Sequence, residues 1–534
     1  MERPLDDAVK LKNLPEEIAM RWPDQVRVDL DLQNGLCRME SEASVLTEVC
    51  SWLFSELGYS FASLVIEEEA TEYSLRYIFY GDLENGRVHI LHQVHKANAT
   101  VPSISHFVHA ADWHEREAED LFGLVFEGHP RLGDFVLHEE WPEGVNPMRA
   151  DFDSSKPYVH REVNPYWRPV RIVQAPGAFM MPIGPIYSDF AESAHFLLET
   201  VGEDVIRTIP RFFYKYRGVE KIAEGRTVDE VLLLAERFSG TSAFAHSLAF
   251  CQAVEEISRV EVPPRAKALR IFLAELERLR HHVGSIAGIC GSTALAVATS
   301  QASILEEELL RLCCVLAGHR YLFGLNTAGG VVKDFSNEAL QKVSDTVQGL
   351  FKGLEDLKEM LRFSSSFLDR LEEVGTVSKE SALSYGLVGP IARASGITRD
   401  LRKVLPYSGY EKIEFIIPCE QEGDGYARLR ILFSEAEQSA NIISQVASSL
   451  PSGQILSPPF EIPPGAALGL AEAPKGAAFH WVRTGEDGRV DRYRVTPPSF
   501  TNWHGFHLAA EDFAFQDFPI IMATFGLSNA ESDR

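Results

Sequence analysis

Hydrophobic positions follow two different periods along the chain. Before about residue 125, short apolar runs predict strands over residues 61–66, 74–80 and 87–94, and a 3.6-residue period predicts a helix over residues 41–57. Asn85-Gly86 predicts a type I′ hairpin between the last two strands, because both turn positions need positive φ. We therefore expect a small α/β unit with an antiparallel hairpin.

Farther along the chain, the apolar positions take helical spacing. Long amphipathic helices are predicted over residues 241–257, 266–283, 305–316 and 340–361, the last capped by Ser336. Such a succession indicates a helical bundle, and the segment from Pro182 predicts strands beside it. The expected fold class is α+β, with a small N-terminal α/β domain and a large, mainly α domain that has a helical-bundle core and peripheral β-structure.

A proline-rich segment separates these two parts. Five prolines, with several glycines and aspartates, lie between Glu139 and Pro169, which is the composition of an extended linker. We therefore predict a first domain over residues 1–138, a linker over 139–169 and a second domain over 170–534.

Charge and cysteine content narrow the class of protein. The 534 residues include 77 acidic and 51 basic side chains, and the net charge of -26 argues against nucleic acid or anionic lipid as a partner. Met1–Lys10 lacks the features of a signal or transit peptide, so we expect a cytoplasmic protein. The seven cysteines form no C-x-x-C pair, so we expect them to be reduced and mostly buried, without a zinc or iron–sulfur site.

The longest uncharged stretch, Val283–Ile304, is long enough to cross a bilayer. It is rich in Gly, Ala, Ser and Thr and lacks aromatic anchors at its ends. We predict a close-packed helix inside the bundle, so any attachment to a membrane would depend on partner subunits.

An acidic motif closes the first domain. From Trp113 to Pro130 the pattern E-R-E-x-x-D-L-F-G-x-x-F-x-G-H-P predicts an amphipathic helix ended by Gly123, and by itself its charges indicate a solvated face. The pattern resembles the signature of the 30-kDa subunit of respiratory complex I and of its counterpart in membrane-bound hydrogenases. That resemblance implies a docking domain without cofactors, whose interface ion-pairing groups would be Glu115, Arg116, Glu117 and Asp120.

The second half carries an ordered series of short segments. They are Gly184-Pro185, Tyr214–Lys221, Val262–Ala266, Glu275–His282, Gly324–Asn326 with Gly329-Gly330, Val388–Pro390 with Arg393–Gly396, Leu468–Gly476 and Asp517–Arg534. The series resembles the large subunit of energy-converting [NiFe] hydrogenases, especially the formate-hydrogenlyase type, and the 49-kDa subunit of complex I. With the first domain, the resemblance covers nearly the whole chain in the order of the fused subunit.

The resemblance also shows where this chain departs from a [NiFe] site. Such a site needs two C-x-x-C pairs, because soft thiolates hold both metals. The register puts the first pair at Ser239 and Ser242 and the second at Ser528 and Glu531. We therefore predict no nickel, no metal bound by this chain and no hydrogenase activity; a hard-metal site on Glu531 and serine oxygens is disfavoured, because it offers one carboxylate.

The quinone contacts that complex I implies are missing as well. Gly240 occupies the place of the quinone-binding tyrosine, and the loop of residues 184–191 has no histidine. Tyr187, Tyr216 or His246 would be substitute contacts, although buried and satisfied core residues are the favoured interpretation.

Arg217 and the two serines near it each have two interpretations. In the relatives, the arginine of the R-G-x-E-K element lies beside a partner's iron–sulfur cluster, where its charge would raise the reduction potential. The alternative is a structural Arg217–Glu220 ion pair. Ser239 or Ser242 would serve as the N-cap of the next helix in a purely structural interpretation.

Three functions follow from the resemblance. The chain is an electron-transfer or proton-coupling subunit of a membrane-associated complex, a structural scaffold of such a complex, or a quinone reductase subunit with substitute contacts. The implied partners are a small subunit with a [4Fe-4S] cluster, a ferredoxin-like subunit, and antiporter-like and complex I-type membrane subunits. Through these partners the chain would lie on the cytoplasmic face of the cell membrane.

An unrelated hydrolase is set aside, because Ser242 and His246 lack a G-x-S-x-G context, and the sequence identifies no catalytic residue.

Overall fold

The computed structural model describes residues 11–82, 84–163, 172–174, 176–187 and 192–534. Contacts divide the chain into two compact units, Met1–Arg168 with Ser384–Gly386 and Pro169–Leu383 with Leu387–Arg534. The division falls inside the predicted linker. The residues of three predictions lie outside the described ranges: Met1–Lys10, the last part of the predicted linker, and residues 188–191 of the loop without a histidine.

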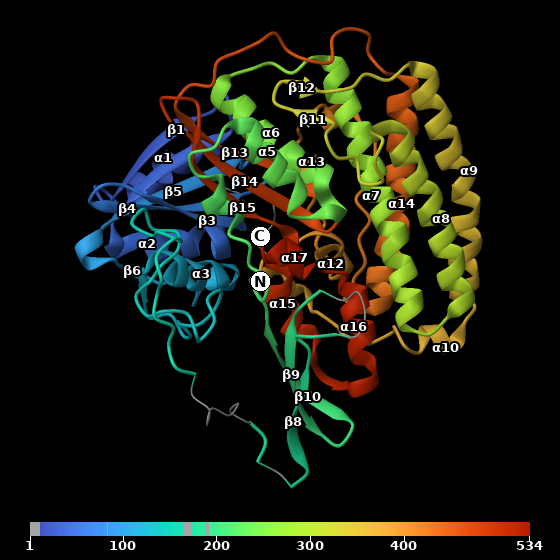
Figure 1. The fold of residues 1–534 in the computed structure, drawn as a ribbon, viewed down its shortest axis with the longest axis horizontal. Coiled ribbons are helices and arrows are strands. Elements are labelled where there is room, and N and C mark those ends of the chain that lie inside the picture. Colours follow the sequence, from blue (N-terminus) through green and yellow to red (C-terminus); the bar gives the residue numbers. More distant parts are fainter. Residues whose placement is uncertain (1–10, 83, 164–171, 175, 188–191) are drawn as a thin grey trace. The chain divides into compact units, whose positions relative to one another are not determined.

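The first unit is built on a five-stranded sheet with the order β1-β2-β5-β4-β3 (Figure 1). The pairing of β2 with β5 is parallel, and the other neighbours are antiparallel. The predicted hairpin is confirmed as β4–β5, but Tyr80 pairs with Arg87 across a loop that is longer than a two-residue turn. The elements of this unit are α1 (Leu14–Arg21), β1 (Val26–Asp31), β2 (Leu36–Ser41), α2 (Ala43–Ser51), β3 (Ser60–Glu68), β4 (Glu72–Tyr80), β5 (Arg87–His95), β6 (Thr100–Pro102), α3 (Asp112–Phe122) and β7 (Val125–Glu127).

Helix α3 ends at Gly123 as predicted, but its charges do not form a solvated face. Glu115, Arg116, Glu117 and Asp120 are all buried. The Asp120 carboxylate accepts the three successive N–H groups of residues 135–137 at 2.9, 2.7 and 2.9 Å. A buried carboxylate needs such donors, and here the chain after α3 provides them. Asp120 therefore holds this segment of its own unit.

Four long helices lie side by side in the second unit (Figure 1). They are α7 (Pro264–Ser292), α8 (Ala296–Ala317), α9 (Asn337–Arg362) and α14 (Gly425–Ser448). Ser336 caps α9 as predicted, accepting the Ala339 N–H at 3.2 Å. With the sheets around the bundle, the predicted α+β fold class is confirmed.

The uncharged stretch Val283–Ile304 is not one helix, and that prediction is wrong. Helix α7 ends at Ser292, and α8 begins at Ala296. Ala294 has φ of 59° in the turn between them, and the small polar residues before it are weak helix formers. Among the described residues, no helix is long and apolar enough to cross a membrane. The cysteines are free, and five of the seven are buried.

Smaller sheets complete the second unit. One has the order β16-β10-β9-β8 and another the order β13-β14-β15. Helix α6 (Ala243–Ser258) lies against β13 at Gly469, where a Cβ would come 1.8 Å from the Ala249 carbonyl oxygen. The strands are β8 (Ala178–Ile183), β9 (His195–Val201), β10 (Asp204–Arg211), β11 (Asn326–Thr327), β12 (Gly330–Val331), β13 (Gly465–Ala473), β14 (Gly476–Thr484), β15 (Val490–Thr496) and β16 (Glu511–Ala514). The other helices are α4 (Val219–Ala223), α5 (Val228–Arg237), α10 (Ser365–Leu368), α11 (Lys379–Ser384), α12 (Gly389–Ala394), α13 (Leu401–Val404), α15 (Pro498–Ala509), α16 (Phe518–Phe525) and α17 (Asn529–Ser532).

Candidate functional site

The loop between α5 and α6 carries Ser239 and Ser242, which the resemblance aligns with the first thiolate pair. Ser239 and Ser242 are buried, and Ser242 occupies the N-cap position of α6 without a side-chain cap hydrogen bond. The Glu277 carboxylate of α7 accepts the Phe244 and Ala245 N–H groups instead, at 2.7 and 3.0 Å. The serine-cap interpretation is therefore wrong, because a carboxylate from another helix supplies the cap. The Ser242 Oγ has no hydrogen-bond partner in the part of the chain that the structure describes.

The C-terminal helix α17 carries the second pair. Ser528 caps it, accepting the Glu531 N–H at 3.1 Å, and donates its own hydroxyl to Glu192 at 2.9 Å. Asp533 accepts the Phe213 and Lys215 N–H groups, both at 3.0 Å. These hydrogen bonds connect the last residues of the chain to the segment before α4. Glu531 has no exposed surface.

Glu531 brings the two pairs together. Its carboxylate accepts from Ser239 Oγ at 3.3 Å and from the Ser499 hydroxyl, contacts His246 Nε2 at 3.0 Å and lies 3.9 Å from Lys475 Nζ. We call Glu531 with these four residues the Glu531 site. Burial alone would raise the pKa of Glu531, but Lys475 and His246 together lower it to about 2. The site therefore holds a carboxylate and an ammonium as a buried pair.

A row of side chains continues behind the site. His246 Nδ1 lies 3.0 Å from His480 Nε2, and His480 Nδ1 lies 2.8 Å from the Tyr493 hydroxyl. All three residues are fully buried. Burial first, and the neighbouring His246 second, lower the pKa of His480 well below its usual range, whereas burial raises the pKa of Tyr493. His480 is therefore neutral, and Tyr493 keeps its proton.

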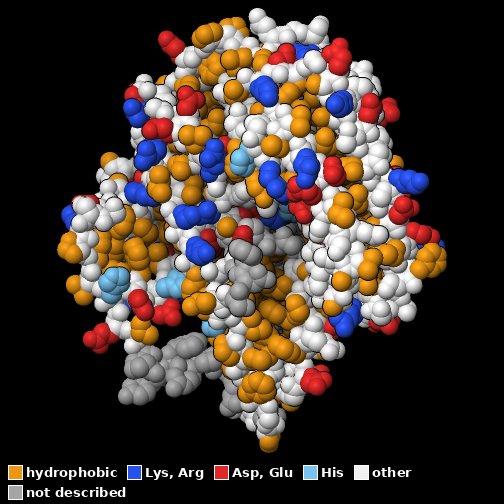
Figure 2. Space-filling model, turned by 45° about the vertical axis from the view of Figure 1, so that its right-hand side comes forward, with side chains coloured by type: hydrophobic (Ala, Val, Ile, Leu, Met, Phe, Trp, Pro, Cys, Tyr) orange, Lys and Arg blue, Asp and Glu red, His pale blue; other side chains and the backbone are white. Residues whose placement is uncertain are grey.

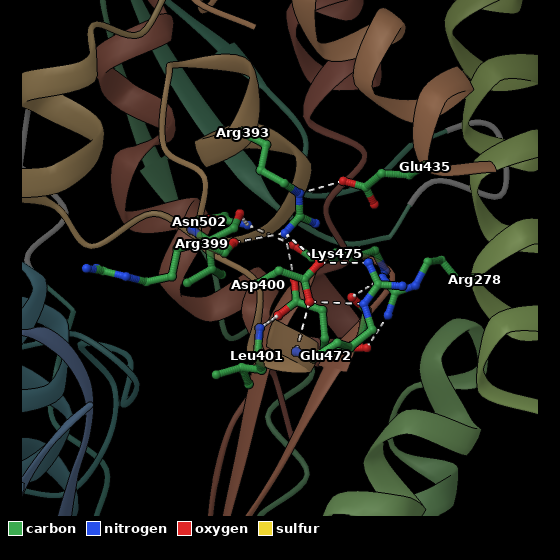
Figure 3. A network of polar contacts seen from close by, with 12 residues as sticks. Arg278, Arg393, Arg399, Asp400, Leu401, Glu435, Glu472, Lys475 and Asn502 are labelled. Atoms are coloured by element: carbon green, nitrogen blue, oxygen red, sulfur yellow. Dashed lines mark hydrogen bonds and ion pairs between the residues drawn. The ribbon is translucent and has the colours of Figure 1, made fainter. Parts of the chain in front are cut away.

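Lys475 is positioned by the turn between β13 and β14. Its Nζ donates to Thr241 Oγ1 at 3.0 Å, and its carbonyl accepts from Asn502 Nδ2 at 3.3 Å. Three residues earlier, Glu472 enters the buried network of Figure 3, where the Arg393 guanidinium lies between the carboxylates of Glu472, Glu435 and Asp400. The turn is thus held at both ends by polar contacts.

The Figure 3 network places several charges in the core of the second unit. Arg393 donates to Glu435 at 2.6 Å and to Glu472 at 3.0 Å, and the Glu472 carboxylate also accepts the Leu401 N–H at 3.0 Å. Although burial opposes it, Arg393 lowers the pKa of Glu435 to about 2, whereas burial and Asp400 raise that of Glu472 to about 7. Breaking such a network leaves charges unpaired in a low dielectric, so it fixes the turn that carries Lys475.

The positions that the resemblance aligns with the four thiolates, Ser239, Ser242, Ser528 and Glu531, do not supply the soft donors of a nickel–iron centre. The four positions offer three hydroxyls and one carboxylate, which are hard donors, and the Lys475 ammonium faces the carboxylate. Among the described residues, no group of three or more His, Cys, Asp or Glu side chains has a geometry that could hold a metal ion.

Arg217 lies next to this site but makes no contact with Glu220 in the described structure. It donates to the carbonyl oxygens of Phe238, at 3.0 Å, and of Ala530. Glu220 instead pairs with Arg492, Arg494 and Arg534 at 3.2, 3.2 and 3.1 Å. The predicted structural Arg217–Glu220 pair is therefore wrong, because three buried arginines already neutralise Glu220. Arg217 ties the loop before α6 to α17.

The three candidate quinone contacts occupy different environments. His246 is buried and has both ring nitrogens within hydrogen-bond distance of protein partners, so it is a satisfied core residue. Tyr187 donates to the Ala194 carbonyl oxygen at 2.9 Å, and Tyr216 is half-buried. A Cβ at Gly240, the position that the resemblance aligns with the quinone-binding tyrosine, would meet no heavy atom within 4 Å, so this position opens onto free space beside Ser239.

Sequence reasoning missed five residues that the structure brings to this region. Lys475 lies in the segment Leu468–Gly476, which is recognisable in the sequence only as part of the resemblance. The buried polar residues of the strands and of α15 look like ordinary alternation. The missed residues are Lys475, His480, Tyr493, Ser499 and Glu192.

Three family descriptions match successive parts of the chain. Residues 39–158 match "Respiratory-chain NADH dehydrogenase, 30 Kd subunit". Residues 217–284 match "Nickel-dependent hydrogenase". Residues 301–459 and 454–534 match "Respiratory-chain NADH dehydrogenase, 49 Kd subunit". The order agrees with the resemblance found in the sequence.

Relatives match over most of their length. Formate hydrogenlyase subunit 5 of Escherichia coli K12 is 29% identical over 503 residues, covering 92% of this chain and 88% of that protein. The C/D subunit of the NADH-quinone oxidoreductase of Bdellovibrio bacteriovorus is 28% identical over 500 residues, covering 86% and 87%. A chain in the solved structure of the membrane-bound sulfane sulfur reductase, an archaeal respiratory membrane complex, has a TM-score of 0.64 and 28% identity, covering 67% of this chain and 99% of that one.

Proposed function

Because this chain belongs to the fused 30-kDa/49-kDa subunits of the complex I and hydrogenase type, we propose that it is a peripheral-arm subunit of a membrane-associated oxidoreductase. In this proposal it couples electron transfer, through a partner iron–sulfur subunit, to ion translocation by membrane subunits, and it does so without a nickel–iron centre. It would lie on the cytoplasmic face of the membrane, held there by its partners.

The single observation that carries the proposal is the Glu531 site. Of the four predicted thiolate positions, three carry serine and one carries Glu531, whose carboxylate forms a buried ion pair with Lys475 from another segment. A pure scaffold would have no need of a paired charge there, because an apolar replacement of similar size is often as stable as a buried ion pair. The charged pair therefore favours a working site over the scaffold alternative.

The proposed electron donor to this site is a [4Fe-4S] cluster in the partner small subunit. Arg217 is exposed, and its guanidinium is held by carbonyl oxygens on both sides of the site, at Phe238 and Ala530. A fixed cation beside a cluster stabilises its reduced form and raises its potential. Replacing Arg217 by methionine should lower the potential of that cluster in the intact complex, and an unchanged potential would rule out this role.

Exposed apolar residues offer a surface for partner subunits. Figure 2 shows hydrophobic side chains gathered at the lower end of the face in view, at the height at which Figure 1 places β8, β9 and β10. Phe179 of β8 is 48% exposed and Ile186, after β8, is 91% exposed. Apolar side chains that gather on one part of a surface are candidates for contact with another protein, whereas single exposed apolar side chains are ordinary.

One experiment on the native complex separates the proposal from its alternatives. The complex is purified with its partners, its nickel and iron are measured, and reoxidation of the reduced partner cluster is followed with quinone analogues and other acceptors. We expect iron without nickel and an oxidation rate that falls when Glu531 is replaced by glutamine. The Thr227→Ala chain, changed at the start of α5, is the control. Stoichiometric nickel, or equal rates in all three complexes, would overturn the proposal.

A further inference from the structure

The four-stranded sheet of the second unit ends on β8, which pairs only with β9 among the strands that the structure describes. The strands β8, β9 and β10 project from the helices of this unit at the lower end of Figure 1. From residue 172 to residue 187 the sequence has no charged side chain. β8 is therefore an edge strand without the charges that usually keep other chains from pairing with such an edge.

Two other sheet edges of the chain do carry charges. At the opposite edge of the same sheet, β16 exposes Glu511 and Asp512. In the five-stranded sheet of the first unit, the edge strand β1 carries Arg27, Asp29 and Asp31. Charged side chains make an edge strand a poor partner for a further strand, so β8 differs from both in what it can accept.

Two prolines show which backbone groups of β8 face the open edge. Pro182 lies opposite Leu197, and Pro210 of β10 lies opposite Phe196. Neither proline has an N–H group for β9, so both fit the pairs of an antiparallel ladder that make no hydrogen bond. Because such pairs alternate with bonded ones, Met180, two residues before Pro182, also directs its N–H and C=O away from β9. The open edge thus offers the Met180 N–H and the carbonyl oxygens of Met180 and Pro182.

Apolar side chains accompany these groups on the face of the sheet that meets the core. Cross-strand partners share a face, so Met181 lies beside Leu198 and Ile183 beside Phe196. Leu198 and Phe196 are fully buried, whereas Met181 and Ile183 are half-buried and Phe179, on the same face of β8, is exposed. The apolar face of the sheet therefore continues into open surface at its edge.

The other face of the sheet presents a charge that is already paired. Met180 lies opposite Glu199, whose carboxylate accepts from Arg207 Nε at 2.7 Å and from the Val173 N–H at 2.8 Å. Glu199 itself has no exposed surface. A charged group arriving at β8 would lose its water without gaining this carboxylate as a partner, which favours an uncharged occupant.

We propose that β8 is the docking edge for an extended, uncharged segment of a partner subunit, which joins the sheet as a fifth strand. The backbone of that segment hydrogen-bonds with Met180 and Pro182, and its apolar side chains cover Phe179 and Ile183. The proposal rests on the proposed function only in taking the segment from a subunit of the same complex.

Two other occupants fit the edge less well. A helix would bury the Met180 N–H without giving it an acceptor, because the backbone carbonyls of a helix are used within the helix. A second copy of this chain carries the same net charge of -26, so repulsion between like charges opposes its approach. A strand from a different subunit meets neither obstacle.

Replacing Met180 by proline tests the backbone of the edge without breaking the sheet. The ladder to β9 does not use the Met180 N–H, and an extended strand has a backbone conformation close to the one that proline requires. Met180→Ala is the matched control, because it also removes the side chain but keeps the N–H. Urea unfolding of both isolated chains checks that each variant folds.

The experiment compares the native complex with the isolated full-length chain. The complex is purified through a tag on this chain in the wild type, Met180→Pro and Met180→Ala, and its subunits are quantified by mass spectrometry. Hydrogen exchange of residues 176–187 is followed in the wild-type complex and in the wild-type chain alone. We expect slow exchange of this segment only in the complex, and a partner subunit whose retention falls about tenfold in Met180→Pro relative to Met180→Ala, the effect of about one well-formed hydrogen bond.

Equal exchange of residues 176–187 in the complex and in the isolated chain would overturn the proposal, even if neither variant folds. Equal retention of every subunit by two folded variants would overturn it as well. A dimer of the isolated chain that Met180→Pro converts to a monomer would assign the edge to a second copy and contradict the choice of a partner subunit. Protection of β8 in a complex that does not reoxidise the partner cluster would refute the proposed function and leave the docking edge standing.

Discussion

Replacing Glu531 by glutamine removes the negative charge that faces the buried Lys475 ammonium. Glutamine has nearly the same size, and its amide oxygen can still accept a hydrogen bond from His246 Nε2, so the change is one of charge more than of shape. We expect the second unit to lose about 3 kcal/mol of its free energy of unfolding at pH 7, because a buried cation is left without its partner. The loss should be concentrated in α17 and at the start of α6.

Two independent routes lead to this magnitude. The pKa of Glu531 falls from 4.5 to about 2 on folding, and at about 1.4 kcal/mol per unit the linked stability is about 3 to 4 kcal/mol. The charges lie 3.9 Å apart, and Coulomb's law with an effective dielectric constant of about 20 gives about 4 kcal/mol. Because the folded pKa is lower than the unfolded one, this stability is present above pH 4.5 and is lost as the pH falls towards 2.

The assay is a double-mutant cycle with Glu531→Gln, Lys475→Met and the double variant. Urea unfolding at pH 7 and hydrogen exchange over residues 239–258 and 515–534 report the global and local free energies. We expect the double variant to be more stable than the sum of the single effects predicts, by about 2–3 kcal/mol, since removing both charges leaves neither one unpaired. Additivity within about 0.5 kcal/mol would refute the conclusion that the two side chains form a charged pair.

Three further changes test other parts of the second unit. Burial raises the pKa of Glu277 to about 7, so its contribution to stability is present below pH 4.5 and is lost as the pH rises through 7. In Glu277→Gln, the free energy of unfolding measured in urea should therefore change less between pH 5 and pH 8 than in the wild type. An unchanged dependence on pH would contradict the raised pKa. Thr227→Ala removes the capping box of α5 and should cost about 1 kcal/mol, measured by thermal unfolding; no loss would show that the box does not hold the helix. Gly469→Ala places a Cβ 1.8 Å from the Ala249 carbonyl oxygen and should speed hydrogen exchange in α6 and β13, whereas wild-type protection there would disprove the close approach.

Periodicity predicted the long helices and the hairpin well, because each depends on neighbours within a few turns or across one short loop. The charges of α3 could not be placed in this way. An acidic helix surface has the same pattern whether water or buried N–H groups solvate it, and only the chain after α3 brings the three donors to Asp120. The prediction of one helix over Val283–Ile304 was wrong for a related reason, since an uncharged composition does not show that a turn at Ala294 interrupts the helix.

The sequence by itself indicated the family and the fold class, and the resemblance in it led to the prediction that Ser239, Ser242, Ser528 and Glu531 stand at thiolate positions, because these inferences depend on residue types and their order. Only the tertiary structure decided what those replacements do. His246 and Glu531 are 285 residues apart and lie 3.0 Å from each other, with Lys475, His480 and Tyr493 arriving from a turn and two strands. Buried polar groups must satisfy one another wherever the fold places them, so their partners are a property of the packed chain.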